Sequence, residues 1–290
     1  MSNEPRILLC GEVRVELPGI SIDRVLTARS AKLAFTYLVL NRRHPVDRDE
    51  LVAAVWADSA PRDPHHALRT VLYRLRRALG PSVVTGRRSV GLNLPAGTVI
   101  DVEEVEQSLG RSEEALAHGR WRTAMEEARN AVLLSEGGLL GGLTAEWLDA
   151  RRRDLEVQRA TALACIAQAS LELGGATLRM GERAARNLID LEPFRESGHA
   201  LLIQTLAARG DVAEALRVYE SVRVKLREEL GTVPNLELRR LHSGLLAGGR
   251  EPVPRRKRAR AARGVALLPV LFGVGGQIDG LDAIIASLPA

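Results

Sequence analysis

The residues best suited to chemistry lie together in residues 63–79, DPHHALRTVLYRLRRAL. Four leucines recur there at spacings of four, three and four, which predicts a helix that buries one stripe of side chains. The stripe consists of Leu68, Leu72, Leu75 and Leu79. The face opposite the stripe should carry polar and basic groups, because successive helical residues are rotated by about 100°. That face comprises His66, Thr70, Tyr73, Arg74 and Arg77, with Arg69 and Arg76 on its flanks.

The polar face of this helix has only one sign of charge, since no acidic residue follows Asp63 within it. A helix face that is merely solvated usually mixes positive and negative side chains, which pair one turn apart. Guanidinium, hydroxyl and imidazole groups, in contrast, suit hydrogen bonding to base edges in the major groove of DNA. The pattern therefore favours a DNA-binding helix over a solvated one.

A hairpin with a basic tip is predicted directly after this helix. Residues 82–95, SVVTGRRSVGLNLP, contain two short β-rich runs, Val83–Thr85 and Val90–Leu94, around a turn at Gly86–Ser89. Arg87 and Arg88 would lie at the tip. A basic turn is weak evidence alone, but after a basic helix it fits a wing that contacts the phosphate backbone.

Patterns that would support catalysis or metal binding are missing from the sequence. His65 and His66 are adjacent, and adjacent helical side chains point apart, so the two cannot share a metal ion. Acid pairs such as Glu103 and Glu104 stand where helices begin, which indicates dipole complementation rather than acid–base chemistry. The sequence has neither a nucleophile elbow nor a phosphate-binding G-x-x-x-x-G-K-[ST] motif. We therefore expect a protein that is not an enzyme and has no cofactor or metal.

The elements before residue 63 should form the support for this helix. Short apolar runs between Arg6 and Val25 are broken by glycine and proline, which predicts a small antiparallel sheet. A helix is expected over Ser30–Asn41, with Ser30 as its cap. Another is expected over Val46–Trp56, where Asp47 and Glu50 are spaced as in a capping box.

Beyond residue 100 the sequence predicts paired helices. They are expected at Val102–His118, Arg120–Ser135, Ala145–Leu173, Thr177–Asp190, Arg195–Ala208, Val212–Glu229 and Leu236–Leu246. The segments Ala117–Leu134 and Ala208–Leu226 resemble each other, each being a glycine turn followed by a helix of small residues. Paired helices of this size indicate a tetratricopeptide-like array.

Charge and composition divide the chain in the same way. The net charge is +6 over residues 1–99, −5 over residues 100–249 and +4 over residues 250–290. A basic first third before an acidic middle is expected if only the first domain meets a polyanion. Aromatic residues make up only 3% of the chain, so a mainly α fold with a small β component is expected.

The remaining sequence features concern location. Residues 250–263 read as a flexible basic linker, and the apolar stretch after them is interrupted by Asp279 and Asp282, which disfavours a membrane anchor. The role of this apolar stretch stays open. The first residues lack the basic start and apolar stretch of a signal peptide, so we expect a cytoplasmic protein. Cys10 and Cys165 lie far apart among apolar neighbours and read as reduced core residues.

Two stretches of the chain resemble the SARP-type bacterial regulators, also called antibiotic regulatory proteins. They are DRDELVAAVWADSAPRDPHHALRTVLYRLRRALG (Asp47–Gly80) and RGDVAEALRVYESVRVKLREELGTVPNLELRRLH (Arg209–His242). The similarity extends over about residues 5–248 and follows the order and spacing of the family. One departure is Gly91-Leu92, where OmpR-like wings usually have an aromatic residue after the glycine.

The resemblance implies an OmpR-like winged helix-turn-helix at residues 1–99 and a bacterial transcriptional activator domain at residues 100–249. It further implies that helix 63–79 enters the major groove and that the wing touches the minor groove or its phosphates. The expected DNA-binding residues are His66, Arg69, Thr70, Tyr73, Arg74, Arg77, Arg87 and Arg88. The implied partners are promoter DNA with tandem direct repeats, RNA polymerase and its sigma factor, and a homodimer on the DNA is compatible with such repeats.

Two other interpretations stay open at this point. The winged helix and the helical repeat could form a protein-docking scaffold without direct DNA readout, because a fold does not dictate a function. A docking face, however, should carry acidic or apolar residues where this helix carries Thr70, Arg74 and Arg77. A scaffold that uses only the helical repeat would leave the basic first domain without a purpose.

Overall fold

A computed structural model describes residues 4–20, 22, 24–57 and 60–248. The chain divides into two units, residues 1–253 and residues 254–290, and the basic linker and apolar tail lie outside the described residues. The first unit is mainly α with two small sheets, as the sequence predicts. We call its residues 4–100 the winged-helix part and its residues 101–248 the helical part.

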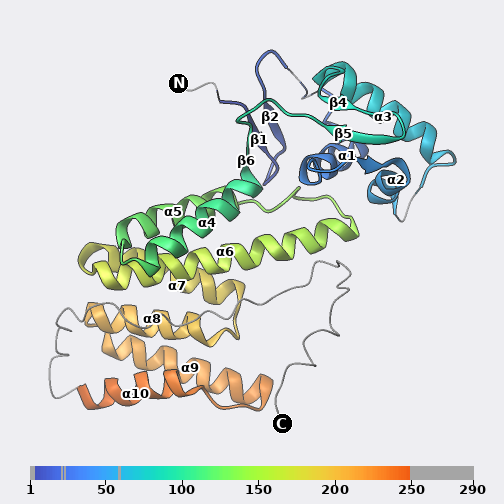
Figure 1. The fold of residues 1–290 in the computed structure, drawn as a ribbon. Coiled ribbons are helices and arrows are strands. Elements are labelled where there is room, and N and C mark those ends of the chain that lie inside the picture. Colours follow the sequence, from blue (N-terminus) through green and yellow to red (C-terminus); the bar gives the residue numbers. More distant parts are fainter. Residues whose placement is uncertain (1–3, 21, 23, 58–59, 249–290) are drawn as a thin grey trace, which may run out of the picture. The chain divides into compact units, whose positions relative to one another are not determined.

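The first sheet of the winged-helix part has three strands in the order β2-β1-β6. Strand β1 (Arg6–Leu8) pairs antiparallel with β2 (Arg14–Glu16), which confirms the predicted antiparallel arrangement. Strand β6 (Val99–Ile100) pairs parallel with β1 and leads directly into the first helix of the helical part (Figure 1). This parallel pair joins segments more than 90 residues apart, and local sequence patterns contain no signal for it.

Three helices follow: α1 (Arg29–Leu40), α2 (Arg48–Trp56) and α3 (Pro64–Leu79). The predicted caps of the first two are wrong. Helix α1 begins at Arg29 and its cap residue is Ala28, two residues before the predicted cap Ser30. Ser30 therefore lies inside the first turn. Asp47 precedes α2 but makes no capping hydrogen bond, and Glu50 accepts a hydrogen bond of 2.7 Å from the Tyr37 hydroxyl instead. A tertiary partner thus takes the carboxylate that the capping box would need.

The second sheet forms the wing. Strands β3 (Val46–Asp47), β5 (Ser89–Leu92) and β4 (Val84–Thr85) lie side by side in the order β3-β5-β4. The predicted hairpin is confirmed, with Val84 opposite Leu92. Leu92 is buried although it stands where related wings have an aromatic residue.

The helical part contains seven α-helices and one short 3-10 turn among the described residues. They are α4 (Asp101–Ala117), α5 (Trp121–Leu134), α6 (Glu146–Leu173), the turn η1 (Gly175–Thr177), α7 (Leu178–Leu191), α8 (Glu196–Arg209), α9 (Val212–Leu230) and α10 (Leu236–Gly248). Consecutive helices pack against each other (Figure 1), as in a tetratricopeptide-like array. Each predicted helix is present with bounds that differ by at most two residues.

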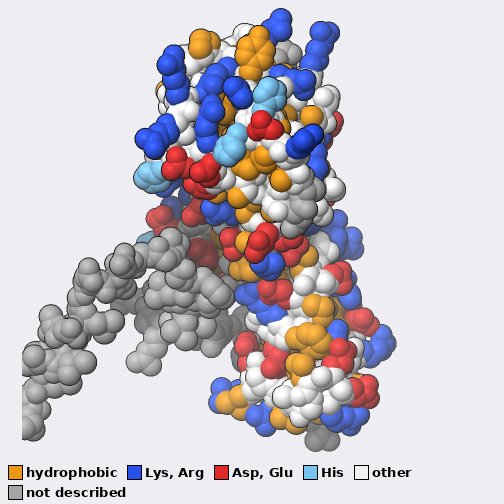
Figure 2. All heavy atoms as spheres, turned by 90° about the vertical axis from the view of Figure 1, so that its right-hand side faces the viewer, with side chains coloured by type: hydrophobic (Ala, Val, Ile, Leu, Met, Phe, Trp, Pro, Cys, Tyr) orange, Lys and Arg blue, Asp and Glu red, His pale blue; other side chains and the backbone are white. Residues whose placement is uncertain are grey.

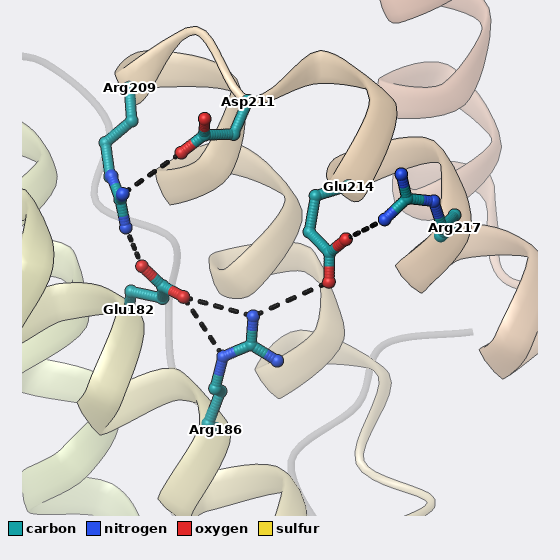
Figure 3. Close-up of polar contacts among 6 residues, drawn as sticks. All are labelled: Glu182, Arg186, Arg209, Asp211, Glu214 and Arg217. Carbon is teal, nitrogen blue, oxygen red and sulfur yellow. Dashed lines mark hydrogen bonds and ion pairs between the residues drawn. The ribbon is translucent and has the colours of Figure 1, made fainter.

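Helices α7, α8 and α9 are joined by a chain of alternating charges, which Figure 3 shows. Its members are Glu182, Arg186, Arg209, Asp211, Glu214 and Arg217. Glu182 is central: it pairs with Arg186 at 3.0 Å on its own helix and with Arg209 on the next one. All three arginines of this chain are paired with carboxylates, so these side chains link the three helices to one another.

The two parts are connected through a buried carboxylate. Asp101, the first residue of α4, is 2% exposed and accepts hydrogen bonds of 2.7 Å from the backbone N–H groups of Leu9 and Cys10. A third bond of 2.8 Å comes from the N–H of Val102. Burial is the main reason that the pKa of Asp101 is raised above its ordinary value, because these donors offset the desolvation only in part.

A second connection lies between α6 and the first two helices. The Trp147 ring meets the Tyr37 ring edge-on at 5.1 Å between centroids, and its Nε1–H donates to the Ala54 carbonyl at 2.9 Å. The Arg29 guanidinium bridges the carbonyls of Val55 and Thr144 at 3.2 and 2.6 Å. No helix in the described part of the chain is both long and apolar enough to cross a membrane.

Candidate nucleic-acid interface

Helix α3 is held in place by its apolar stripe and its caps. Leu68, Leu72 and Leu75 are fully buried against the other helices of the winged-helix part. The Asp63 carboxylate accepts a hydrogen bond of 2.9 Å from the N–H of His66, and Pro64 occupies the first helical position. The predicted stripe, start and end of this helix are therefore confirmed.

All of the polar side chains predicted on the outer face of α3 are exposed. They are His66, Arg69, Thr70, Tyr73, Arg74 and Arg77. Tyr73 is an exposed aromatic ring, with 64% of its surface accessible. The Thr70 hydroxyl donates to the His66 carbonyl at 3.2 Å, and Arg69 lies 3.3 Å from the His66 ring nitrogen. The oxygen of Thr70 keeps its lone pairs available as acceptors for an outside donor.

The arginines of this face have no acidic partners. Among the residues that the structure describes, Arg69, Arg74 and Arg77 form no ion pair with a carboxylate. Many arginines of the helical part, in contrast, are paired within it. Figure 2 shows Lys and Arg side chains gathered over the winged-helix part, while the helical part mixes both signs. The outer face of α3 thus carries three exposed arginines without a carboxylate partner among the described residues.

The wing has a tip that only glycine can form. Gly86 has a φ of +84°, and a Cβ there would lie 2.0 Å from the Ser89 carbonyl oxygen. Arg87 and Arg88 follow in the turn and are exposed, without ion pairs among the described residues. Both candidate phosphate-binding residues are therefore accessible and without a carboxylate partner among the described residues.

The contact that Arg76 makes with the wing was not predicted from the sequence. Arg76, which the helical geometry placed on a flank of the DNA face, ties the wing to α3. Its Nε donates to the Val84 carbonyl at 3.1 Å and its Nη2 to the Gly86 carbonyl at 2.5 Å. The sequence feature that could have indicated this contact is the position of Arg76 between the buried stripe and the outer face, eight residues before Val84 of the hairpin.

The other chemically capable groups are inert by position. Cys165 is buried and Cys10 is half-buried, and burial raises the pKa of both thiols, that of Cys165 to about 11. Burial also lowers the pKa of His199. No cluster of three metal-ligating side chains is present among the residues for which the structure gives positions. The side chains exposed on the outer face of α3 and at the wing tip are therefore mainly arginines, together with His66, Thr70 and Tyr73.

Comparison with known proteins identifies the helical part. Residues 100–246 match the bacterial transcriptional activator domain. The regulatory protein AfsR of Streptomyces griseus is 26% identical over 259 residues, which is 87% of this chain but only 26% of AfsR. This chain thus spans about a quarter of the length of AfsR. DnrI of Streptomyces peucetius is 26% identical over 263 residues, which cover 83% of this chain and 92% of that regulator.

The regulator EmbR is similar to this chain in both sequence and fold. The EmbR sequence from Mycobacterium tuberculosis is 25% identical over 279 residues, covering 93% of this chain and 70% of that one. The structure of EmbR in complex with a low affinity phosphopeptide superimposes with a TM-score of 0.74 at 22% identity, over 87% of this chain and 67% of EmbR. That likeness shows the shared fold of a winged helix followed by a helical array. The chain therefore belongs to the SARP-type bacterial regulators that carry a bacterial transcriptional activator domain.

Proposed function

We propose that this chain is a sequence-specific DNA-binding transcriptional regulator that activates promoters containing tandem direct repeats. The observation that carries the proposal is the outer face of α3, where Arg69, Arg74 and Arg77 are exposed, unpaired with any described carboxylate and accompanied by hydrogen-bonding side chains. Like charges gathered on one surface repel each other, and a polyanion relieves that repulsion. Duplex DNA supplies a polyanion whose major groove admits an α-helix.

The proposal assigns different tasks to the two basic elements. Arg74 and Thr70 lie on the face of α3 opposite the buried leucines, so they read base edges in the major groove. Arg87 and Arg88 stand at the wing tip and bind phosphates, which fixes the register of the protein without reading sequence. Arg76 acts as a positioning residue, because it links α3 to the wing.

The partners of the regulator follow from its family membership. SARP-type proteins combine a winged helix with an activator domain, and this chain has both in the same order. We therefore propose that residues 1–99 form the DNA-binding domain and that residues 100–249 contact RNA polymerase and its sigma factor. Tandem repeats place two copies of the chain next to each other on the promoter.

Genome-wide mapping of bound DNA, followed by titration of a recovered site, tests this function. Recovery of a tandem-repeat motif supports it. On that site, Arg74→Ala should cost on the order of 1–3 kcal/mol, with a smaller loss on scrambled duplex. The matched control is Arg122→Ala, which removes an exposed arginine from α5 in the helical part and should leave both affinities unchanged.

Two results would contradict the proposal. If Arg74→Ala lowers the affinities for operator and scrambled duplex in equal proportion, the orientation of α3 in the groove is wrong. If the folded protein enriches no DNA motif and the α3 variants bind DNA like the wild type, the winged helix is instead a protein-docking module.

A further inference from the structure

A cavity of about 530 Å³ lies beside the connection between the two parts. One wall is the glycine-rich loop 137–144 between α5 and α6, and the other comes from α6, with Leu191 at the edge. Its volume falls within the range of small-molecule sites, which are mostly apolar with a few placed polar groups. Leu143 and Leu191 present accessible apolar surface there, while Leu139 and Leu155 are buried behind it. We call this space the loop cavity.

The two arginines that line the loop cavity have different roles. Arg152 is fully engaged: its Nε and Nη2 donate to the carbonyls of Leu139 and Leu140 at 2.9 and 2.7 Å, and its Nη1 pairs with Asp149. Arg159 makes no hydrogen bond or ion pair with any described residue, and its Nε is buried without a partner. A buried donor without an acceptor is rare in folded proteins and calls for a partner.

The surroundings of Arg159 restrict the chemistry of that partner. A guanidinium binds carboxylates and phosphates through paired hydrogen bonds. Glu156 also lines the cavity, one turn before Arg159 on α6, and its negative charge penalises a ligand with more than one charge. We propose that the loop cavity binds a small organic monocarboxylate, with its carboxylate on Arg159 and its apolar body against Leu143 and Leu191.

The same loop contacts the winged-helix part, so occupancy of the cavity is linked to it. The Gly138 carbonyl accepts a hydrogen bond of 2.7 Å from the N–H of Gly11, and Arg29 at the start of α1 donates to the Thr144 carbonyl. A Cβ on Gly137 would lie 3.0 Å from the Gly11 Cα, so the two segments touch. A ligand on the loop therefore changes the affinity of the winged-helix part for DNA, a coupling that rests on the function proposed above.

Octanoate serves as the probe, with octanol as its uncharged control and octyl phosphate as the dianion. Titrated into the ¹⁵N-labelled full chain, octanoate should shift amide resonances of loop 137–144, whereas octanol should not at equal concentration. Arg159→Gln should weaken octanoate binding about tenfold or more, the value of one charge-assisted contact. Glu156→Gln should strengthen it and admit octyl phosphate. Arg153→Gln, on the exposed side of α6, is the matched control and should bind octanoate like the wild type.

The coupling is measured on the full chain with duplex DNA. Octanoate should change the DNA affinity, and DNA should change the octanoate affinity by the same factor. The proposed site is wrong if a folded Arg159→Gln variant binds octanoate as tightly as the wild type. It is also wrong if Glu156→Gln leaves octanoate binding unchanged. Octanoate binding without any change in DNA affinity overturns the coupling. Octanoate binding by a protein that binds no DNA leaves the site standing and refutes the proposed function.

Discussion

Replacement of Asp101 by alanine tests how the winged-helix part and the helical part are held together. The carboxylate accepts three backbone hydrogen bonds, from Leu9, Cys10 and Val102, and the first two donors directly follow strand β1 of the other part. Alanine leaves the Leu9 N–H buried without an acceptor, which costs about 1–3 kcal/mol. The Cys10 and Val102 donors are only partly buried, so water reaches them and their loss costs less.

The expected change in the free energy of unfolding combines two effects of opposite sign, the loss of these hydrogen bonds and the burial of the carboxylate. Removing the carboxylate also relieves its desolvation, which is the largest contribution to its raised pKa. We therefore expect Asp101→Ala to lower the free energy of unfolding by roughly 2–4 kcal/mol. The Glu103→Ala variant is the matched control: it removes a charge from the same turn of α4 and breaks the pair with Arg42, but it orphans no backbone donor. Its expected cost is about 1 kcal/mol or less.

Urea unfolding followed by tryptophan fluorescence measures this difference, because Trp147 lies at the connection. Amide exchange at Leu9 and Cys10 supplies a local readout and should accelerate in Asp101→Ala far more than in the control. Equal destabilisation by Asp101→Ala and Glu103→Ala would refute the reasoning, because the buried donors would then contribute nothing beyond charge.

The raised pKa of Asp101 determines how its contribution to the stability of the protein changes with pH. Its pKa is raised in the folded protein, so between its ordinary value, about 4, and the raised value the native state binds more protons than the unfolded chain. Stability contributed by this group is fully present below the ordinary value and is lost as the pH rises through the raised one. The unfolding free energy of the wild type minus that of Asp101→Asn should decline as the pH rises above about 4, until it has passed the raised pKa of Asp101. A difference that grows with pH would mean that the three donors outweigh burial.

Three further predictions concern the interface and the helical array. Changing Arg87 and Arg88 together to alanine should weaken binding about equally on operator and random DNA and lower the slope of log affinity against log salt by about 2; a loss confined to the operator would show that the wing reads bases. Arg76→Met should weaken binding to both duplexes while circular dichroism stays unchanged, because the wing loses its tie to α3; wild-type affinity would show that the wing is held without it. Glu182→Gln should destabilise the helical part by about 1 kcal/mol in thermal unfolding, since two arginines lose their shared carboxylate. Glu220→Gln removes a more exposed pair, the one with Arg223, and should cause no measurable change.

Periodic patterns predicted most of the helices because their determinants are local. The leucine stripe of α3 and the glycine turns of the helical part fix which residues face inward and where each helix ends. The same local geometry placed His66, Thr70, Tyr73, Arg74 and Arg77 on the outer face, and all of them are exposed. The basic tip of the wing was predictable for the same reason, since a short hairpin is specified by its own turn.

Contacts between distant segments were decided only by the tertiary structure. The expected capping box at Asp47 failed because Glu50 is engaged by Tyr37, a partner thirteen residues away that no local pattern encodes. The expected cap at Ser30 failed because α1 begins at Arg29, before it. Glu103 and Glu104 lie in the first turn of α4 as the sequence predicted, but only the structure shows that their neighbour Asp101 is a buried acceptor for another segment. The loop cavity and its unpartnered Arg159 depend on how loop 137–144 folds over α6. A sequence determines which faces can be buried, but which polar group meets which partner depends on chain segments that come together only in the folded protein.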